Sequence, residues 1–382
     1  MNGLSRHRAA FALACGFVGL ASGCTALPEN VDATRAVDRS DIGRAVLAMR
    51  WQFAAGEPGN QTRPQEHASA AVSERHIFVG SDDGVLYALS ADDGRLLWKR
   101  EVGAIDTRPV VERSRLYVAT KDGELLCLDA LSGTELWRHR TRAPILEPPA
   151  LGDELIFVAN EADTVVALDK ESGDFRWQHE DERDVDLPLH GHAGVSLDGD
   201  LLVTGYASGT LVALRAETGQ VEWMTALAAG HDRFADIHAT PVIDGDTVFA
   251  ASVAGGVYAL DRDDGEVRWR LPISGAGGLA LKGDTIYVTA ADEGVVAIER
   301  SGHEIWRQGT AGGGISPRPI VSGDYLIYTL SEAGMYIADR HTGRVHQFFD
   351  PGFGITAEPT IDGDNLYVVS NNAILYAMRL RR

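Results

Sequence analysis

The residue whose sequence context most clearly indicates a chemical reaction is Cys24, a candidate for acylation. A basic start and a mainly apolar stretch (Ala9–Leu20) lead into Leu20-Ala21-Ser22-Gly23-Cys24. Small residues between a short apolar core and a cysteine are typical of a bacterial lipoprotein signal, in which the thiol is acylated with fatty acids such as palmitate. We predict a signal peptide at residues 1–23, lipidation of Cys24 and a polar tether at 24–48. The alternative is an ordinary signal with a chance cysteine.

The other reactive side chains do not form a catalytic pattern. His190 and His192 are spaced like two metal ligands, and His231 or His238 could supply a third. Two histidines in a loop more often have a structural or solvent-exposed role, so we expect no metal. Cys127 falls where most repeats described below have alanine, which predicts a small buried residue. The sequence also lacks a Gly-x-Ser-x-Gly elbow, so we expect no catalysis.

Composition excludes two further classes. The chain has 382 residues with 55 acidic and 35 basic side chains, which gives a net charge of -20. Such a surface repels phosphate backbones, so we expect no nucleic-acid partner. No apolar run reaches the roughly 18–20 residues that a membrane-spanning helix needs. Any membrane attachment is therefore expected to come from the lipid on Cys24.

One pattern recurs along the chain: a strand, a short turn that ends in glycine, and a strand that carries tryptophan. The glycine always precedes the tryptophan by four residues, and it can adopt the positive φ that a short hairpin requires. The copies that keep the tryptophan are Leu86–Trp98, Leu125–Trp137, Val165–Trp177, Leu211–Trp223, Val257–Trp269 and Val295–Trp306. A further copy, Met335–Gln347, has lost it. We expect each tryptophan to wedge against the next repeat.

A second pattern precedes most copies: an X-Pro step, as in Arg108-Pro109, Thr240-Pro241 and Glu358-Pro359. Proline is tolerated at the start of a strand, where no ladder donor is needed. Each repeat then reads as four short strands over about 40 residues, which is typical of a β-propeller blade.

The number of repeats predicts an all-β, eight-bladed β-propeller of four-stranded blades at residues 49–382. Seven copies carry the turn, and an eighth starts at Pro359 but ends without a fourth strand. The missing strand is found at the other end of the domain, around Trp51. An N-terminal strand that completes the last blade closes the ring and removes two exposed edges.

These repeats resemble the quinoprotein-type repeat of quinone-cofactor alcohol dehydrogenases and of several non-enzymatic propellers. Together with the lipoprotein signal and the tether, they resemble the BamB family of outer-membrane-protein assembly factors. The resemblance implies a propeller anchored by lipid to the outer membrane, facing the periplasm and lacking cofactors. It also implies that the propeller docks the POTRA domains of BamA, the core of the barrel-assembly (BAM) complex.

Two loops extend the resemblance. Leu187-Pro188-Leu189-His190-Gly191 resembles an exposed loop of that family, and the segment Asp232–Pro241 resembles its Asp-Arg-rich loop. Carried over by position, the implied partner contacts are Leu187, Leu189, His190, Asp236 and His238. His190 stands where the family usually has arginine, and His238 where it often has aspartate.

The expected role is thus a non-catalytic scaffold that aids insertion of outer-membrane proteins and could also hold their unfolded chains through its strand edges. Two other classes remain open. One is a quinone- or metal-dependent oxidoreductase, although this chain lacks the adjacent cysteine pair general in the quinone enzymes. The other is a ligand-sensing or polysaccharide-binding propeller.

Overall fold

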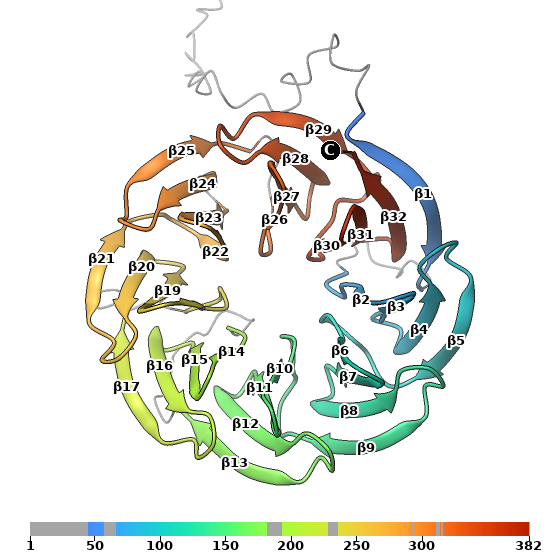
Figure 1. Ribbon diagram of the computed structural model, residues 1–382, viewed down its shortest axis with the longest axis horizontal. Coiled ribbons are helices and arrows are strands. Elements are labelled where there is room, and N and C mark those ends of the chain that lie inside the picture. The colour runs from blue at the N-terminus through green and yellow to red at the C-terminus, as the bar shows by residue number, and fades with distance from the viewer. Residues whose placement is uncertain are drawn as a thin grey trace, which may run out of the picture.

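Short antiparallel strands make up the described part of this protein. The computed structural model describes residues 45–56, 66–181, 193–227, 236–291, 293–310, 314 and 316–381. These residues form eight four-stranded sheets around one axis (Figure 1). In this part of the chain, no helix is long and apolar enough to cross a membrane.

The two inner strands of each blade lie nearest the axis. The innermost strands are β2 (Ala71–Ser73), β6 (Val110–Glu112), β10 (Ala150–Leu151), β14 (Ser196–Asp198), β18 (Val242–Asp244), β22 (Ala276–Lys282), β26 (Ile320–Ser322) and β30 (Thr360–Asp362). The second strands are β3 (His76–Val79), β7 (Arg115–Ala119), β11 (Leu155–Asn160), β15 (Leu201–Gly205), β19 (Thr247–Ser252), β23 (Thr285–Ala290), β27 (Tyr325–Thr329) and β31 (Asn365–Val369).

The two outer strands of each blade complete the sheet. The third strands are β4 (Val85–Ser90), β8 (Glu124–Asp129), β12 (Thr164–Asp169), β16 (Thr210–Arg215), β20 (Gly256–Asp261), β24 (Gly294–Glu299), β28 (Met335–Asp339) and β32 (Ile374–Leu380). The outermost strands are β5 (Leu96–Glu101), β9 (Glu135–Arg140), β13 (Phe175–Glu180), β17 (Val221–Ala226), β21 (Val267–Leu271), β25 (Glu304–Gln308), β29 (Val345–Phe349) and β1 (Leu47–Ala54).

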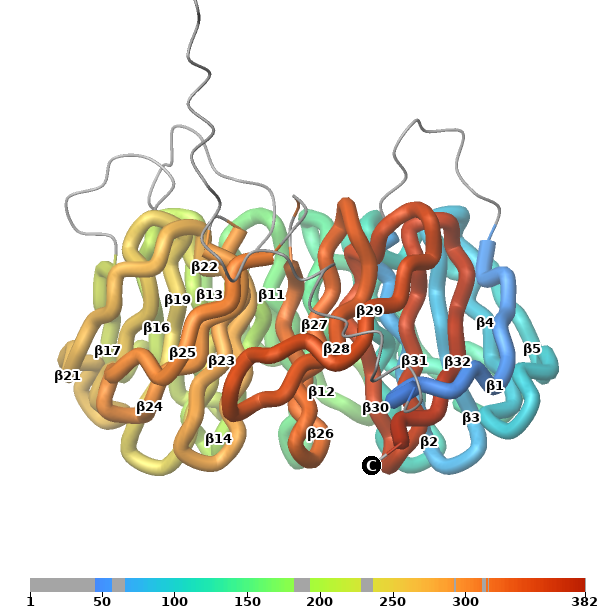
Figure 2. Tube along the Cα trace, turned by 90° about the horizontal axis from the view of Figure 1, so that it is seen from above, coloured from blue at the N-terminus to red at the C-terminus, as the bar shows by residue number. Residues whose placement is uncertain are grey.

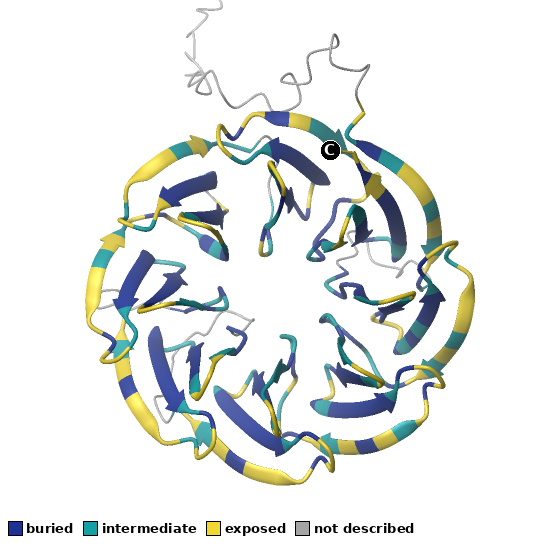
Figure 3. Ribbon diagram, viewed as in Figure 1, coloured by how far each residue is buried: buried dark blue, intermediate teal, exposed yellow. Residues whose placement is uncertain are grey.

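Burial follows the position of a strand within its blade (Figure 3). The second and third strands are covered on both faces by neighbouring blades and are almost wholly buried, as Ile77–Val79 in β3 and Leu125–Leu128 in β8 illustrate. The outermost strands alternate between exposed and covered residues, with the tryptophan on the covered side. The core is therefore a ring of apolar layers between blades, with one cluster centred on each interface.

Each tryptophan joins its blade to the next one. All seven indole Nε1 groups donate a hydrogen bond, at 2.8–3.2 Å, to a backbone carbonyl in the outer hairpin turn of the following blade. Trp98, for example, donates to the Ala130 carbonyl at 3.1 Å. The prediction that tryptophan wedges against the next repeat is confirmed, with an added hydrogen bond that fixes the angle of the ring.

The turn glycines are needed at these contacts for two reasons. Gly133 has a φ of +69°, and a Cβ there would lie 2.9 Å from the Trp98 ring. A side chain at this position would thus meet both a strained backbone and a large rigid neighbour. Each turn glycine therefore receives the tryptophan of the preceding blade, while the tryptophan four residues later contacts the following one.

One interface lacks this contact. Gln347 pairs with Ile337 in the register that tryptophan occupies in the other blades, as in the Ala88–Trp98 pair. Its Oε1 accepts a hydrogen bond at 2.9 Å from the backbone N–H of Leu47, the first residue of β1. The interface between the blades of β29 and β32, which we call the seam, is held instead by apolar packing that includes Phe349 and Tyr376.

The predicted closure of the ring is confirmed. β1 pairs with β32 from Leu47↔Leu380 to Ala54↔Ile374, and Trp51 donates to the Ala91 carbonyl of the next blade. The strand begins at Leu47, before the predicted start at Met49. Figure 2 shows the C-terminal end at the lower face, where β1 also begins. The segments that lead from one blade to the next follow the outermost strands and so start at the opposite face, the connector face.

Candidate functional site

The two loops expected to contact a partner are connectors between neighbouring blades. One leads from β13 to β14 and the other from β17 to β18. Leu187, Leu189 and His190 lie outside the described residues, as does Cys24. The structure therefore places the two ends of each connector, and the contacts carried by those residues stay predictions.

The residues that follow the two connectors are in direct contact. Ala193 and Ile237 belong to one buried cluster, and the Gly194 N–H donates to the Thr240 hydroxyl at 3.1 Å. The Ile237 N–H also donates to the carbonyl of Tyr206, in the blade that the first connector enters. Both predicted loops therefore return to the ring at one place on the connector face.

Asp236 and His238, the other two predicted partner contacts, lie within the described residues. The Asp236 side chain is only 1% exposed, and its backbone carbonyl accepts a hydrogen bond from the Val253 N–H at 3.1 Å. The Asp236 side chain is thus covered in this structure, and its contact with a partner stays a prediction. His238 is half-buried and lines the axial cavity described below.

Polar contacts also fix the strand end that precedes the first connector. The Ser208 hydroxyl donates to Asp181 at 2.5 Å, and the Ala207 N–H donates to Asp163 at 3.0 Å. His179 Nδ1 lies 2.7 Å from the Tyr206 hydroxyl, and burial lowers the pKa of His179, so its ring stays neutral at pH 7. The base of this connector is therefore a rigid platform.

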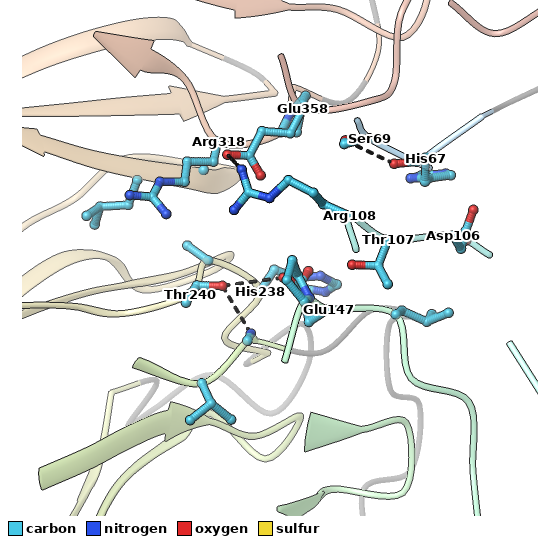
Figure 4. A pocket seen from close by; sticks show the side chains of 18 of the residues that line it. His67, Ser69, Asp106, Thr107, Arg108, Glu147, His238, Thr240, Arg318 and Glu358 are labelled. Carbon is cyan, nitrogen blue, oxygen red and sulfur yellow. Dashed lines mark hydrogen bonds and ion pairs between the residues drawn. The ribbon is translucent and has the colours of Figure 1, made fainter. Parts of the chain in front are cut away.

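A cavity of about 470 Å³ lies on the axis of the ring (Figure 4). Its wall includes residues of all eight blades, most of them just before or at the start of the innermost strands, so this axial channel lies toward the connector face. The sequence patterns did not predict this cavity as a site. The available signal was the X-Pro step, because the residue before the proline in Arg108-Pro109, Thr240-Pro241, Arg318-Pro319 and Glu358-Pro359 lines the cavity.

The charges of the channel are unevenly paired. Arg108 Nη1 lies 3.7 Å from Glu358 Oε1. The two residues belong to blades that are not neighbours in the ring. Asp106 lies 3.5 Å from the Lys121 ammonium group. Arg318 is exposed, and among the described residues it makes no ion pair or hydrogen bond. Figure 4 shows its guanidinium directed away from the Arg108–Glu358 pair.

Among the acidic side chains of the channel wall, the carboxyl of Glu147 has the pKa that is shifted furthest from its ordinary value. Burial, together with the nearby carboxylate of Glu358, raises the pKa of this carboxyl to about 8, against the opposing effects of Arg108 and the Thr240 hydroxyl. The Thr240 hydroxyl donates to Glu147 Oε2 at 3.5 Å. The carboxyl is thus mostly protonated at pH 7, where it can donate a hydrogen bond.

A second raised pKa lies near the mouth of the channel. Burial raises the pKa of Glu66 to about 8, although its carboxylate accepts a hydrogen bond from the Ala68 N–H. The Glu66 N–H donates to Asn371 Oδ1, and the Asn371 amide donates to the carbonyls of Ser331 and Phe353. This buried network joins three blades around the seam, which gives Asn371 a structural role.

Redox and metal chemistry receive no support from the described residues. They contain no group of three or more His, Cys, Asp or Glu side chains arranged to hold a metal ion. Cys127 is fully buried, as predicted, and burial raises the pKa of its thiol to about 11. Such a thiol is a poor nucleophile at neutral pH. The predicted histidine pair, His190 and His192, lies outside the described residues.

Comparison with solved structures supports the fold. BamB from Moraxella catarrhalis superimposes with a TM-score of 0.76 and 20% identity, over 87% of this chain and 100% of that one. Quinohemoprotein alcohol dehydrogenase from Comamonas testosteroni gives 0.72 and 14%, over 88% and 76%, and the computationally designed Ika8 protein gives 0.69 and 17%, over 85% and 99%. At these identities the likeness shows the fold alone. No curated protein sequence matches the chain.

The family follows from a sequence model rather than from these superpositions. A model described as "Outer membrane protein assembly factor BamB" matches residues 48–105 and 103–308. The matched region covers more than half of the 382 residues and runs through most of the blades. The chain belongs to the BamB family of outer membrane protein assembly factors.

Proposed function

We propose that this protein is a non-catalytic scaffold of the outer-membrane barrel-assembly machinery. In this role it docks the POTRA domains of BamA through its connectors at residues 182–192 and 228–235. It is held at the periplasmic face of the outer membrane by a lipid on Cys24. The observation that carries the proposal is that the two connectors resembling the family's partner loops re-enter the ring side by side, through Ala193 and Ile237. A docking surface needs such neighbouring loops on a rigid support.

The energetics favour the leucines over the other predicted contacts. A few buried apolar anchors usually supply most of the affinity of an interface. Leu187 and Leu189 are the apolar side chains of the predicted set, whereas Asp236 is held inside the protein. We therefore assign Leu187 and Leu189 the main contacts, His190 a peripheral one, and Asp236 and His238 the support of the second connector.

Affinity capture of BamA from detergent-solubilised membranes tests the proposal. Against the wild-type protein, Leu187→Ala/Leu189→Ala is expected to reduce BamA capture by about tenfold or more, because loss of interface anchors costs about 2 kcal/mol or more. Leu131→Ala is the matched control, because Leu131 is a 66% exposed leucine in an outer hairpin turn. Equal thermal midpoints for the three proteins show that the fold is intact.

Two results of this experiment would contradict the proposal. Unchanged capture by the double variant moves the interface away from the connectors, and absence of BamA from the wild-type sample removes the scaffold role itself.

The superposition with quinohemoprotein alcohol dehydrogenase makes an oxidoreductase the alternative. Stoichiometric uptake of added quinone cofactor and calcium, followed by absorbance, would favour that activity. Mass spectrometry of the mature N-terminus tests for acyl chains on Cys24.

A further inference from the structure

The axial channel contains an arginine with room beside it. Arg318 is exposed to the cavity and has no ion pair or hydrogen bond among the described residues. In the preceding blade the equivalent residue is Gly278, whose backbone packs against Thr289 and Pro317 and so leaves no open space of its own. A Cβ placed on the adjacent Gly277 would meet no atom closer than 3.9 Å. Among the described residues, the guanidinium therefore has no carboxylate partner, and it lines a cavity that leaves room for a ligand.

The acidic groups of the channel are already occupied. Glu358 is paired with Arg108, Asp106 with Lys121, and Glu147 accepts a hydrogen bond from Thr240. A cation would have to displace one of these contacts. An anion, in contrast, would find the positive charge of Arg318 available and would break no existing pair.

Two hydroxyl groups in the wall also lack acceptors. Thr107 and Thr356 are each 3% exposed, both line the cavity, and neither Oγ1 has a hydrogen-bond partner among the described residues. Figure 4 shows the Thr107 hydroxyl pointing toward the interior of the channel. A buried hydroxyl without a partner costs about 1–3 kcal/mol. Both oxygens are covered in this structure, so an oxygen-rich ligand near this wall would supply the missing acceptor only after a small rotation of the threonine side chain toward the cavity.

We propose that the axial channel binds a small oxyanion, a polycarboxylate or a phosphate, with Arg318 as its main ionic contact. The planar fork of a guanidinium matches the paired oxygens of either group. The net charge of -20 does not prevent this, because exposed charges beyond about 10 Å are screened at 0.1 M salt. The cavity of about 470 Å³ has the volume of a small-molecule site.

Calorimetric titration of the intact protein at 0.1 M salt tests the site. The probes are citrate, succinate and inorganic phosphate, and dimethyl succinate is the uncharged control. We expect at least one anion to bind once per chain with a Kd below about 1 mM, and the one that binds separates carboxylate from phosphate recognition. Arg318→Gln should weaken it about tenfold or more, and Arg318→Lys by less, because lysine keeps the charge but loses the fork.

The control variant is Arg95→Gln, which removes an exposed arginine from a hairpin turn outside the channel. It is expected to bind the anion as the wild-type protein does. Equal affinity of the wild-type, Arg318→Gln and Arg318→Lys proteins would overturn the proposal, as would binding of none of the three anions below about 10 mM. Arg318→Gln should also capture BamA normally, so failure of this site and failure of the scaffold role are separate results.

Discussion

At the scale of single residues, the protein holds two protonated acids in an otherwise acidic molecule. Burial raises the pKa values of Glu66 and Glu147 to about 8. Carboxylates in the exposed hairpin turns behave in the opposite way, because hydrogen bonds from the turn and a nearby arginine lower the pKa of Asp169 to about 2. The two groups of acids therefore influence stability in different pH ranges.

This difference predicts how stability depends on pH above 5. The unfolded chain releases the Glu147 proton near 4.5, whereas the folded protein keeps it to about pH 8. The stability from this proton is thus fully present below 4.5 and is lost as pH rises through 8. Glu147→Gln should flatten the fall in unfolding free energy by about 1 kcal/mol per pH unit, below the one-proton limit of about 1.4 because the channel admits solvent.

Urea unfolding at intervals between pH 5 and 9 measures this slope. Glu217→Gln, a change at an exposed turn residue, is expected to keep the wild-type slope. If Glu147→Gln and Glu217→Gln follow the same curve, the Glu147 carboxyl is already ionised in the folded protein at neutral pH and the assignment is wrong. Glu66 is unchanged in both variants, so part of the slope should remain in each.

The sequence predicts these residues less well than it predicts the blades. Arg108 and Glu358 meet across the channel although 250 positions separate them, and a linear pattern shows only that each precedes a proline. Asp236 was implied as a partner contact only by its position in the Asp-Arg-rich loop, and the structure shows its side chain covered. Its burial depends on the packing of the next residue, Ile237, against Gly205 of the preceding blade, and no local motif reports that contact.

At the scale of elements, neighbouring blades are held together by the contact between a tryptophan and the outer hairpin turn of the next blade. Trp177 is 9% exposed and donates to the Ala216 carbonyl at 2.9 Å, while Gly219 approaches its ring so closely that a Cβ would lie 2.6 Å away. The contact combines apolar burial with one hydrogen bond. The contact could be predicted from the sequence, because the glycine and the tryptophan recur in each repeat and the tryptophan was expected to wedge against the next one. The two residues that meet come from successive repeats, and the indole hydrogen bond could not be predicted.

Replacing the donor tests the hydrogen bond together with the part of the ring that phenylalanine lacks. Trp177→Phe keeps an aromatic ring but leaves the Ala216 carbonyl without its donor, so we expect a loss of roughly 1–3 kcal/mol in unfolding free energy. Phe175→Tyr, two positions earlier on the 52% exposed side of the same strand, should change it by less than about 0.5 kcal/mol. Chemical denaturation followed by circular dichroism measures both, and equal midpoints would show that the hydrogen bond contributes no net stability.

At the scale of the whole molecule, the ring depends on a strand that comes from the far end of the chain. β1 pairs with β32 along its length, and the Arg381 N–H donates to the Val46 carbonyl at 2.7 Å. This closure could be predicted by counting, because the last repeat lacks a fourth strand. The glutamine at the seam was visible as a lost tryptophan, but its hydrogen bond to Leu47 required the ring to be closed first.

Removing the closing strand should therefore change the state of association. A chain that begins at residue 66 lacks β1 and exposes the edge of β32, so we expect it to form oligomers or aggregates. A chain that begins at residue 45 keeps β1 and should stay monomeric. Light scattering coupled to size exclusion distinguishes them, and a stable monomer of the shorter chain would show that β1 is dispensable for closure.

The placement of the indoles has an optical consequence. All seven tryptophans of the chain lie at blade interfaces, so intrinsic fluorescence samples every interface except the seam. Separation of the blades at the seam would leave each emitter in its native surroundings. Unfolding that starts at the seam would therefore not change the tryptophan fluorescence at first. A fluorophore attached near Gln347 would detect this separation before the tryptophan emission changes.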